Sequence, residues 1–194
     1  MLNESAIRKD ITKCLDERGC EPMHKRINES ADERIYGHVR PEGVSEWTFA
    51  DCVGRDMTGE IYDNDIDIRK CGVTSLNGAP KVVNGAFLCS NNELTSLEGG
   101  PEVVNGPFSC GHNRLTSLEG GPKKINGVFD CDYNELTSLE GAPVEIGDHS
   151  FSCRNNKLTT LKGCPEKIGG GWKFGGIDCQ HNKLTSLEGG PKEV

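Results

Sequence analysis

The sequence predicts an α+β protein that consists of a solenoid over residues 59–194 and a helical N-terminal segment over residues 1–58. The first observation is a repeated phrase, F-x-C-x-x-N-x-L-T-S-L-E-G-G-P, whose second Leu recurs every 21 residues at Leu97, Leu118 and Leu139. The second is the size of each unit, which is too small to bury its own apolar side chains, so neighbouring units must stack to make a core. The third is that the first 58 residues lack this phrase and carry apolar residues at helical spacing instead.

The N-terminal segment is expected to hold two helices followed by a packed stretch. Ser5 can cap the first helix and Gly19 can end it. Trp47 and Phe49 belong to the later apolar stretch. We interpret the segment as a helical cap, because the end of a solenoid exposes its core, with a small functional domain as the alternative. The apolar stripes of the two helices are Ile7, Ile11, Cys14 and Leu15 in the first, and Met23, Ile27, Ala31 and Ile35 in the second.

Each repeat is predicted to contribute one strand to a single parallel sheet. Phe108 and Cys110 are two residues apart, so both side chains point to one face of the strand, which is the core. Leu115 and Leu118 form the opposite wall, and the Asn113 amide can bond backbone groups at the bend. The segment between strands is short and rich in Gly and Pro, so the convex side is expected to be irregular.

The repeat resembles the leucine-rich repeat in its short bacterial form, with Phe and Cys in place of the first two leucines. The L-T-S-L-E-G-G/A-P phrase is similar to that of small leucine-rich repeat proteins carried by large tailed bacteriophages. The resemblance covers about two thirds of the chain and implies a right-handed solenoid of about six repeats. Bacterial effectors with units of this length carry a long domain after the repeats, and this chain has none, so ubiquitin-ligase activity is not implied.

Composition and charge argue against several classes of function. The net charge is −8 and no basic patch is present, so no nucleic-acid partner is expected. No apolar run reaches about eighteen residues, so no membrane span is expected, and the N-terminus lacks the apolar region of a secretory signal. No spacing typical of a metal or cofactor site occurs, so neither is expected.

The ten cysteines are expected to be free thiols rather than a disulfide framework. Half of them share one repeat position, which stacks them one strand apart. Their Cβ atoms would then lie ~4.8 Å apart, against the ~3.8 Å that a disulfide prefers. Free cysteines in this number favour a reducing cytoplasm, in a bacterium or a phage-infected host cell.

The candidate binding residues lie where the repeats differ from one another. The phrase L-T-S-L-E-G is nearly constant, whereas the concave sheet face and the position before each repeat Asn vary. We predict that a protein partner contacts this varied face, with a solvated surface that has no partner as the alternative. The predicted partner-binding residues on it are Leu88, Asn91, His112, Asp130, Asp132, Tyr133, Arg154 and His181.

The widest departure from the period is a Gly-flanked insertion, G-G-G-W-K-F-G-G, over residues 169–176. It presents Trp172 and Phe174, and aromatic residues in loops often anchor interfaces. We therefore predict that both bind the partner. The alternative is that both rings fold back and cover the solenoid.

These observations favour a non-enzymatic protein–protein interaction module. A sharper form, which follows from the resemblance, is a phage-encoded inhibitor of a host defence enzyme. The alternatives are a bacterial leucine-rich repeat effector, or a small enzyme whose site lies in the N-terminal segment. A further hypothesis is a homodimer through the uncapped C-terminal repeat, because an open sheet edge invites pairing. Residues available to an N-terminal enzyme site are Cys20, His24, His38 and Cys52.

Overall fold

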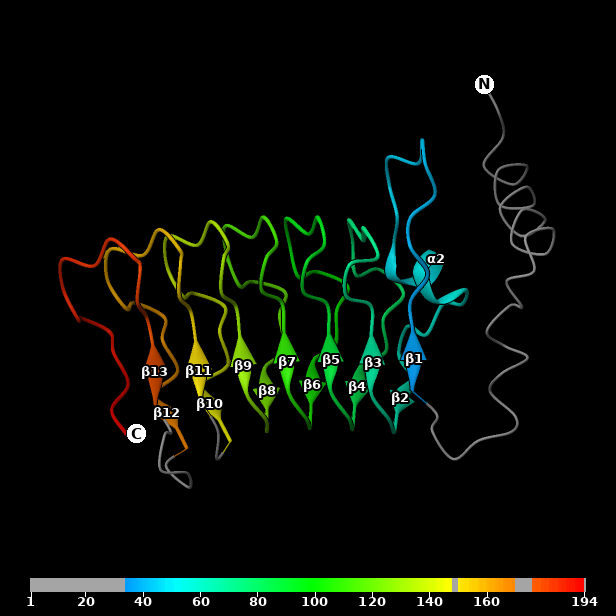
Figure 1. Ribbon diagram of the computed structural model, residues 1–194. Helices are drawn as coiled ribbons and strands as arrows, with labels where there is room; N and C mark the ends of the chain where they lie inside the picture. The colour runs from blue at the N-terminus through cyan, green and yellow to red at the C-terminus, as the bar shows by residue number, and fades with distance from the viewer. Residues whose placement is uncertain (1–33, 148–149, 170–175, 194) are drawn as a thin grey trace. The chain divides into compact units, whose positions relative to one another are not determined.

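The chain forms a parallel β-solenoid, which confirms the predicted repeat architecture (Figure 1). The computed structural model describes residues 34–147, 150–169 and 176–193. From Arg34 onward these residues belong to one compact unit. Short strands alternate along the sequence between two parallel sheets, so each coil of the solenoid contributes one strand to each sheet.

The first sheet has seven strands, and the motif F-x-C supplies most of them. Its strands pair in parallel, so that Ile66, Phe87 and Phe108 lie side by side. The first residue of each of these three strands is buried and the second is half-buried, as the alternation of a strand requires. In order across the sheet the strands are β1 (Ile35–Tyr36), β3 (Ile66–Asp67), β5 (Phe87–Leu88), β7 (Phe108–Ser109), β9 (Phe129–Asp130), β11 (Phe151–Ser152) and β13 (Ile177–Asp178).

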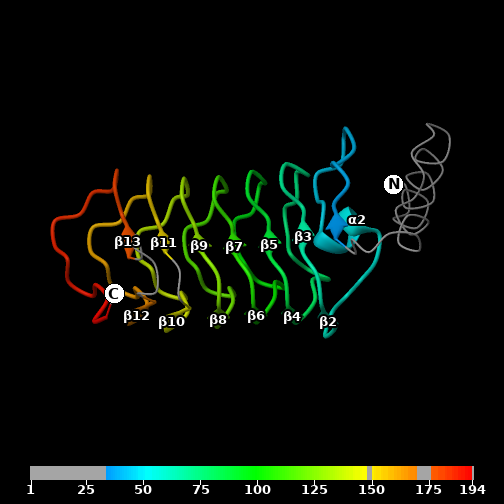
Figure 2. The same ribbon diagram turned by 60° about the horizontal axis from the view of Figure 1, so that its bottom comes forward.

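A second sheet of six strands replaces the irregular convex side, so the prediction of a single sheet was wrong. The two sheets run as separate rows of strands (Figure 2). The spacer after each Gly-Pro pairs an outward residue with a buried β-branched one, as at Val103 and Val104, which is the pattern of a half-buried strand. The strands are β2 (Ile61–Tyr62), β4 (Val82–Val83), β6 (Val103–Val104), β8 (Lys124–Ile125), β10 (Glu145–Ile146) and β12 (Lys167–Ile168).

The core lies inside the coils and consists of columns of identical residues. Phe108 and Phe129 stack with ring centroids 5.6 Å apart, and Phe129 and Phe151 follow at 4.9 Å. Cys110 and Leu115 are fully buried, which confirms that these letters of the repeat are core positions. Each coil therefore repeats the same side-chain layer on the one before it.

An asparagine ladder joins the coils at the bend after each F-x-C strand. The Asn113 side chain accepts a hydrogen bond at Oδ1 from the Leu94 backbone N–H at 3.0 Å. Its Nδ2 donates to the carbonyls of Cys89 and Cys110 at 3.1 and 3.0 Å. The predicted role of the repeat Asn is thus confirmed, and each amide bonds its own coil and the preceding one. The equivalent ladder members are Asn92, Asn134, Asn156 and Asn182.

Only one helix is found in the described part of the chain, so that part is an all-β solenoid rather than α+β. It is α2 (Phe49–Val53), which begins with a capping box between Thr48 and Asp51 and ends at the left-handed Gly54. The Phe49 ring is buried and stacks on Phe87 at 5.9 Å, which extends the aromatic column.

The predicted N-terminal helices fall on residues 1–33, outside the described residues, with one exception. Ile35, which was expected in the second helical stripe, lies in β1 and pairs with Ile66 of β3. The first sheet therefore extends into the segment that was expected to form a helical cap or a small domain. Within the described residues, no helix is both long and apolar enough to cross a membrane.

Candidate functional site

The outer face of the seven-stranded sheet carries all the candidate binding residues that the structure describes. The side chain that follows Phe points away from the core, because its neighbours on either side are buried. The side chain that follows Cys is two residues further along the strand and therefore lies on the same outer face. Leu88 and Asp130 occupy the position after Phe, whereas Asp132 and Arg154 occupy the position after Cys. The third row of this face, before each ladder Asn, contains Asn91, His112, Tyr133 and His181.

The third row is a column of residues in the left-handed backbone region. Left-handed φ is strained for a residue with a Cβ, at about 1–2 kcal/mol each. Except after Lys70, which Cys71 follows, the next residue is the ladder Asn, whose side chain turns inward and bonds backbone groups. The column comprises Lys70 (φ 60°), Asn91 (58°), His112 (53°), Tyr133 (52°), Asn155 (52°) and His181 (56°).

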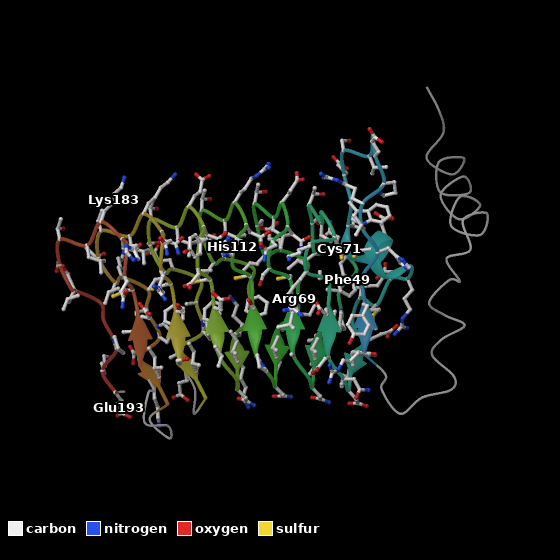
Figure 3. The ribbon with its side chains drawn as sticks, viewed as in Figure 1. Phe49, Arg69, Cys71, His112, Lys183 and Glu193 are labelled. Atoms are coloured by element: carbon white, nitrogen blue, oxygen red, sulfur yellow. The ribbon has the colours of Figure 1, made fainter. Side chains whose placement is uncertain are left out.

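His112 and Tyr133 form an exposed aromatic pair at the middle of this column (Figure 3 labels His112). Their rings are stacked, with centroids 4.2 Å apart and planes inclined by 10°. The Tyr133 side chain is still half exposed, at 50%. The two rings therefore support each other, and half of the Tyr133 surface stays accessible to a partner.

The acidic residues beside the pair are held by hydrogen bonds within the face. Asp130 accepts from the Ser109 hydroxyl at 2.7 Å and from the Asp132 backbone N–H at 2.9 Å. Asp132 accepts from the Ser152 hydroxyl at 2.6 Å and from the Arg154 backbone N–H at 2.7 Å. Both carboxylates thus have fixed positions, which is typical of a preorganised surface.

Burial is the largest influence on the Asp132 carboxyl and raises its pKa above the ordinary value of 3.8. The neighbouring Asp130 also raises this pKa, while the bond from Ser152 and the charge of Arg154 lower it. The Arg154 guanidinium Nε lies 3.6 Å from Oδ2 of Asp178, which is an ion pair too long for a hydrogen bond. The centre of the face therefore combines two acids, one arginine and two aromatic rings.

Gly111 packs closely against the Asp130 carboxylate. It occupies the position after Cys, where the adjacent coils carry Ser90 and Asp132. A Cβ added to Gly111 would lie 3.2 Å from both carboxylate oxygens of Asp130. The absence of a side chain at Gly111 therefore lets the Asp130 carboxylate lie close against the backbone of the neighbouring coil.

A second group lies on the same face at its N-terminal end, and its Tyr36 was missed by sequence reasoning. Tyr36 of β1 pairs with Asp67 of β3 and is 48% exposed. Arg69 forms an ion pair with Asp67, and its guanidinium is the largest influence that lowers the pKa of that carboxyl (Figure 3). Tyr36 precedes the repeats, so only the long-range pairing of β1 with β3 places it here.

Two predicted binding residues, Trp172 and Phe174, lie outside the described residues, so their role stays a prediction. Of the residues available to an N-terminal enzyme site, His38 is half-buried and Cys52 is buried, while Cys20 and His24 lie outside the described part. Among the described residues, no three His, Cys, Asp or Glu side chains are placed to hold a metal ion. The eight described cysteines are free thiols.

Comparison with known proteins assigns no family to this chain. The resemblance of the repeat to the leucine-rich repeat therefore rests on the sequence phrase alone and stays a prediction. No family model, no curated protein sequence and no solved structure matches the chain.

Proposed function

We propose that this chain is a non-enzymatic binding module, whose protein partner contacts the outer face of the seven-stranded sheet around His112 and Tyr133. The single observation that carries the proposal is the exposed stack of these two rings at 4.2 Å. Aromatic residues with a polar tip are enriched at interfaces and dominate their energetics. Here they stand beside Asp130, Asp132 and Arg154 on that face.

Rigidity of the pair supports this role. The ladder residues Asn113 and Asn134 directly follow His112 and Tyr133, and each amide bonds the backbone of two coils. The backbone that carries the two rings is therefore held in position before any partner arrives. A preorganised contact loses little conformational entropy on binding, so more of its contact energy remains as affinity.

The surroundings of the pair fit the rim of an interface. Asp130, Asp132 and Arg154 lie beside the rings, and the two carboxylates already have hydrogen-bond donors within the face. Charged groups arranged in this way give specificity and orientation more than affinity. The resemblance to phage-borne repeat proteins adds a sharper form of the proposal, in which the partner is a host defence enzyme that the module inhibits.

The experiment compares capture of proteins from a bacterial lysate by the wild-type chain and by the His112→Asn/Tyr133→Asn double variant. Asn suits these positions because Asn91 and Asn155 already adopt the same backbone conformation, with φ of 58° and 52°. We expect the double variant to lose its specifically captured protein, with affinity at least about thirtyfold lower, as for hot-spot residues worth about 2 kcal/mol.

The matched control is Val144→Asn, which removes a 65% exposed apolar side chain beside β10 of the other sheet. It should retain the wild-type capture. The proposal fails if the folded double variant captures the same protein at wild-type affinity, or if the control loses as much as the double variant.

Self-association is a second candidate, and one observation favours it. Leu187 is 72% exposed, whereas its equivalents Leu118 and Leu139 are at most 1% exposed. A second copy that covers this coil would bury the apolar side chain. Light scattering should then show a dimer for the wild-type chain and a monomer for Leu187→Glu. A wild-type monomer at high concentration would exclude this candidate.

A further inference from the structure

Two cysteines that do not belong to the cysteine column lie against each other at the N-terminal end of the described solenoid. Cys52 is in α2, and Cys71 is in the turn that follows β3 (Figure 3 labels Cys71). The Cys52 thiol donates to the His38 carbonyl at 3.3 Å and the Cys71 thiol donates to the Arg69 carbonyl at 3.5 Å, and each of the two thiols shifts the pKa of the other. Both side chains are buried, at 0% and 3% exposure.

The space for the two sulfur atoms comes from Gly37. A Cβ added to Gly37 would overlap with Sγ of Cys52 and would lie 3.0 Å from Sγ of Cys71. One strand segment also bonds both cysteines, because the His38 N–H donates to the Cys52 carbonyl at 2.8 Å and the Arg40 N–H donates to the Cys71 carbonyl at 2.7 Å. The backbones of the two cysteines are therefore fixed on either side of residues 37–40.

The first coil departs from the repeat at two positions, and these departures favour a pair of Cys71 with Cys52. Ile68 stands where later coils carry the column cysteine, and Cys71 stands where they carry the ladder Asn. The coil that carries Ile68 and Cys71 is also the coil that lies next to Cys52. The first coil thus replaces its ladder amide with a thiol at the place where a second thiol is available.

The column cysteines also donate to carbonyls, as Cys89 and Cys131 do to the following coil at 3.3 and 3.4 Å, so these bonds do not distinguish them from Cys52 and Cys71. The difference lies in the direction of their side chains. Neighbours in this column lie on parallel strands with nearly parallel Cβ directions, which does not suit a disulfide. Burial raises the pKa of Cys89 and Cys131, whereas the neighbouring Cys52 thiol lowers the pKa of Cys71 and Cys71 in turn raises the pKa of Cys52.

We propose that Cys52 and Cys71 form a reversible disulfide when the chain meets a small-molecule disulfide such as oxidised glutathione. The Cys71 thiolate attacks one sulfur of oxidised glutathione, which forms a mixed disulfide and releases one glutathione thiolate. The Cys52 thiol gives its proton to that thiolate, and the resulting Cys52 thiolate attacks the Cys71 sulfur and releases the second glutathione. Two protein thiols are oxidised and one glutathione disulfide is reduced.

The cross-link would join α2 covalently to the first coil of the repeat. It would thereby fix the segment that bears Tyr36 and Phe49, since residues 37–40 lie between the two cysteines. Neither the aromatic pair nor its acidic neighbours take part in this chemistry, so the inference does not depend on the proposed function.

The test equilibrates the full chain at increasing ratios of oxidised to reduced glutathione, followed by acid quenching, alkylation in denaturant and tryptic digestion. A parallel sample is refolded in the same buffers, so that burial cannot keep the oxidant away. We expect a disulfide between the peptides 35–55 and 71–81, half-formed at a ratio at least about tenfold lower than any other cysteine pair requires.

Two variants serve as controls. Cys71→Ser should abolish the cross-link and leave Cys52 alkylated, while Cys110→Ser should leave the cross-link unchanged. The proposal is overturned if both peptides stay alkylated in the refolded sample, or if Cys52 or Cys71 pairs first with another cysteine. Glutathione that remains on Cys71 without resolution by Cys52 would overturn it too.

Discussion

Replacement of Asn113 by Ala gives the sharpest test of the ladder. Its Oδ1 is the acceptor for the Leu94 N–H at 3.0 Å, and the side chain is 8% exposed, so water cannot replace it. The carbonyls of Cys89 and Cys110 lose one donor each but keep another, from Asn92 at 2.9 Å and from Asn134 at 3.1 Å. The main cost is therefore one buried N–H without an acceptor.

The magnitude follows from this count. An unsatisfied buried donor costs about 1–3 kcal/mol, and each weakened carbonyl adds a fraction of the ~1 kcal/mol of an ordinary hydrogen bond. We expect Asn113→Ala to lower the free energy of unfolding by about 2–3 kcal/mol. At about 2–4 °C per kcal/mol for a chain of this size, the melting temperature should fall by roughly 5–10 °C.

Asn182→Ala is the matched control, because Asn182 makes the same contacts on a half-exposed coil. Its Oδ1 accepts from the Leu158 N–H at 3.1 Å, but water can reach the site after the change. We expect a loss of about 1 kcal/mol or less. Urea unfolding measures both variants, and hydrogen exchange at the Leu94 amide reports the local opening. Equal losses in the two variants, or unchanged exchange at Leu94, would refute the reasoning.

Three further predictions follow from the described contacts. Gly120→Ala should destabilise the chain more than Gly43→Ala in thermal melts. Both glycines have φ near 80°, but only a Cβ added at Gly120 would meet backbone, 2.7 Å from the Glu98 nitrogen. Equal effects of the two substitutions would contradict this. The raised pKa of Asp132 means that the folded protein loses stability as pH rises from 3.8 through the higher folded pKa. The free energy of unfolding of Asp132→Asn should therefore increase relative to that of the wild type across this range, as measured by urea titrations. A difference between the two proteins that stays constant with pH would count against this. Cys110, whose pKa is raised by burial, should resist iodoacetamide in the native state and react after denaturation, as peptide mapping would show.

The columns of the core were predictable because they follow from single letters of the repeat. Phe108 and Cys110 alternate within a strand, and Asn113 has an amide that suits a bend. The second sheet was missed because Gly and Pro mark turns more strongly than two residues mark a strand. Val104 and Ile125, each after an outward residue, were the available signal.

The candidate site was predicted as a set of positions but not as a geometry. Asn and His are enriched among residues with left-handed φ, so Asn91, His112 and Asn155 carried a signal for that column. The stacking of His112 on Tyr133 depends on the side-chain conformations of two coils, which no spacing specifies. The contact between Cys52 and Cys71 depends on the path of residues 37–40, which do not repeat.

The in-register pairing of the coils has a consequence for how such a chain can change length. Residues 94–101 and 115–122 are identical in sequence, L-T-S-L-E-G-G-P, and lie one coil apart. Unequal recombination between them would excise one coil and leave every remaining column in register. The same event would remove His112 and set Asn91 beside Tyr133. A single genetic step could therefore abolish the aromatic pair while it preserves a fully folded solenoid.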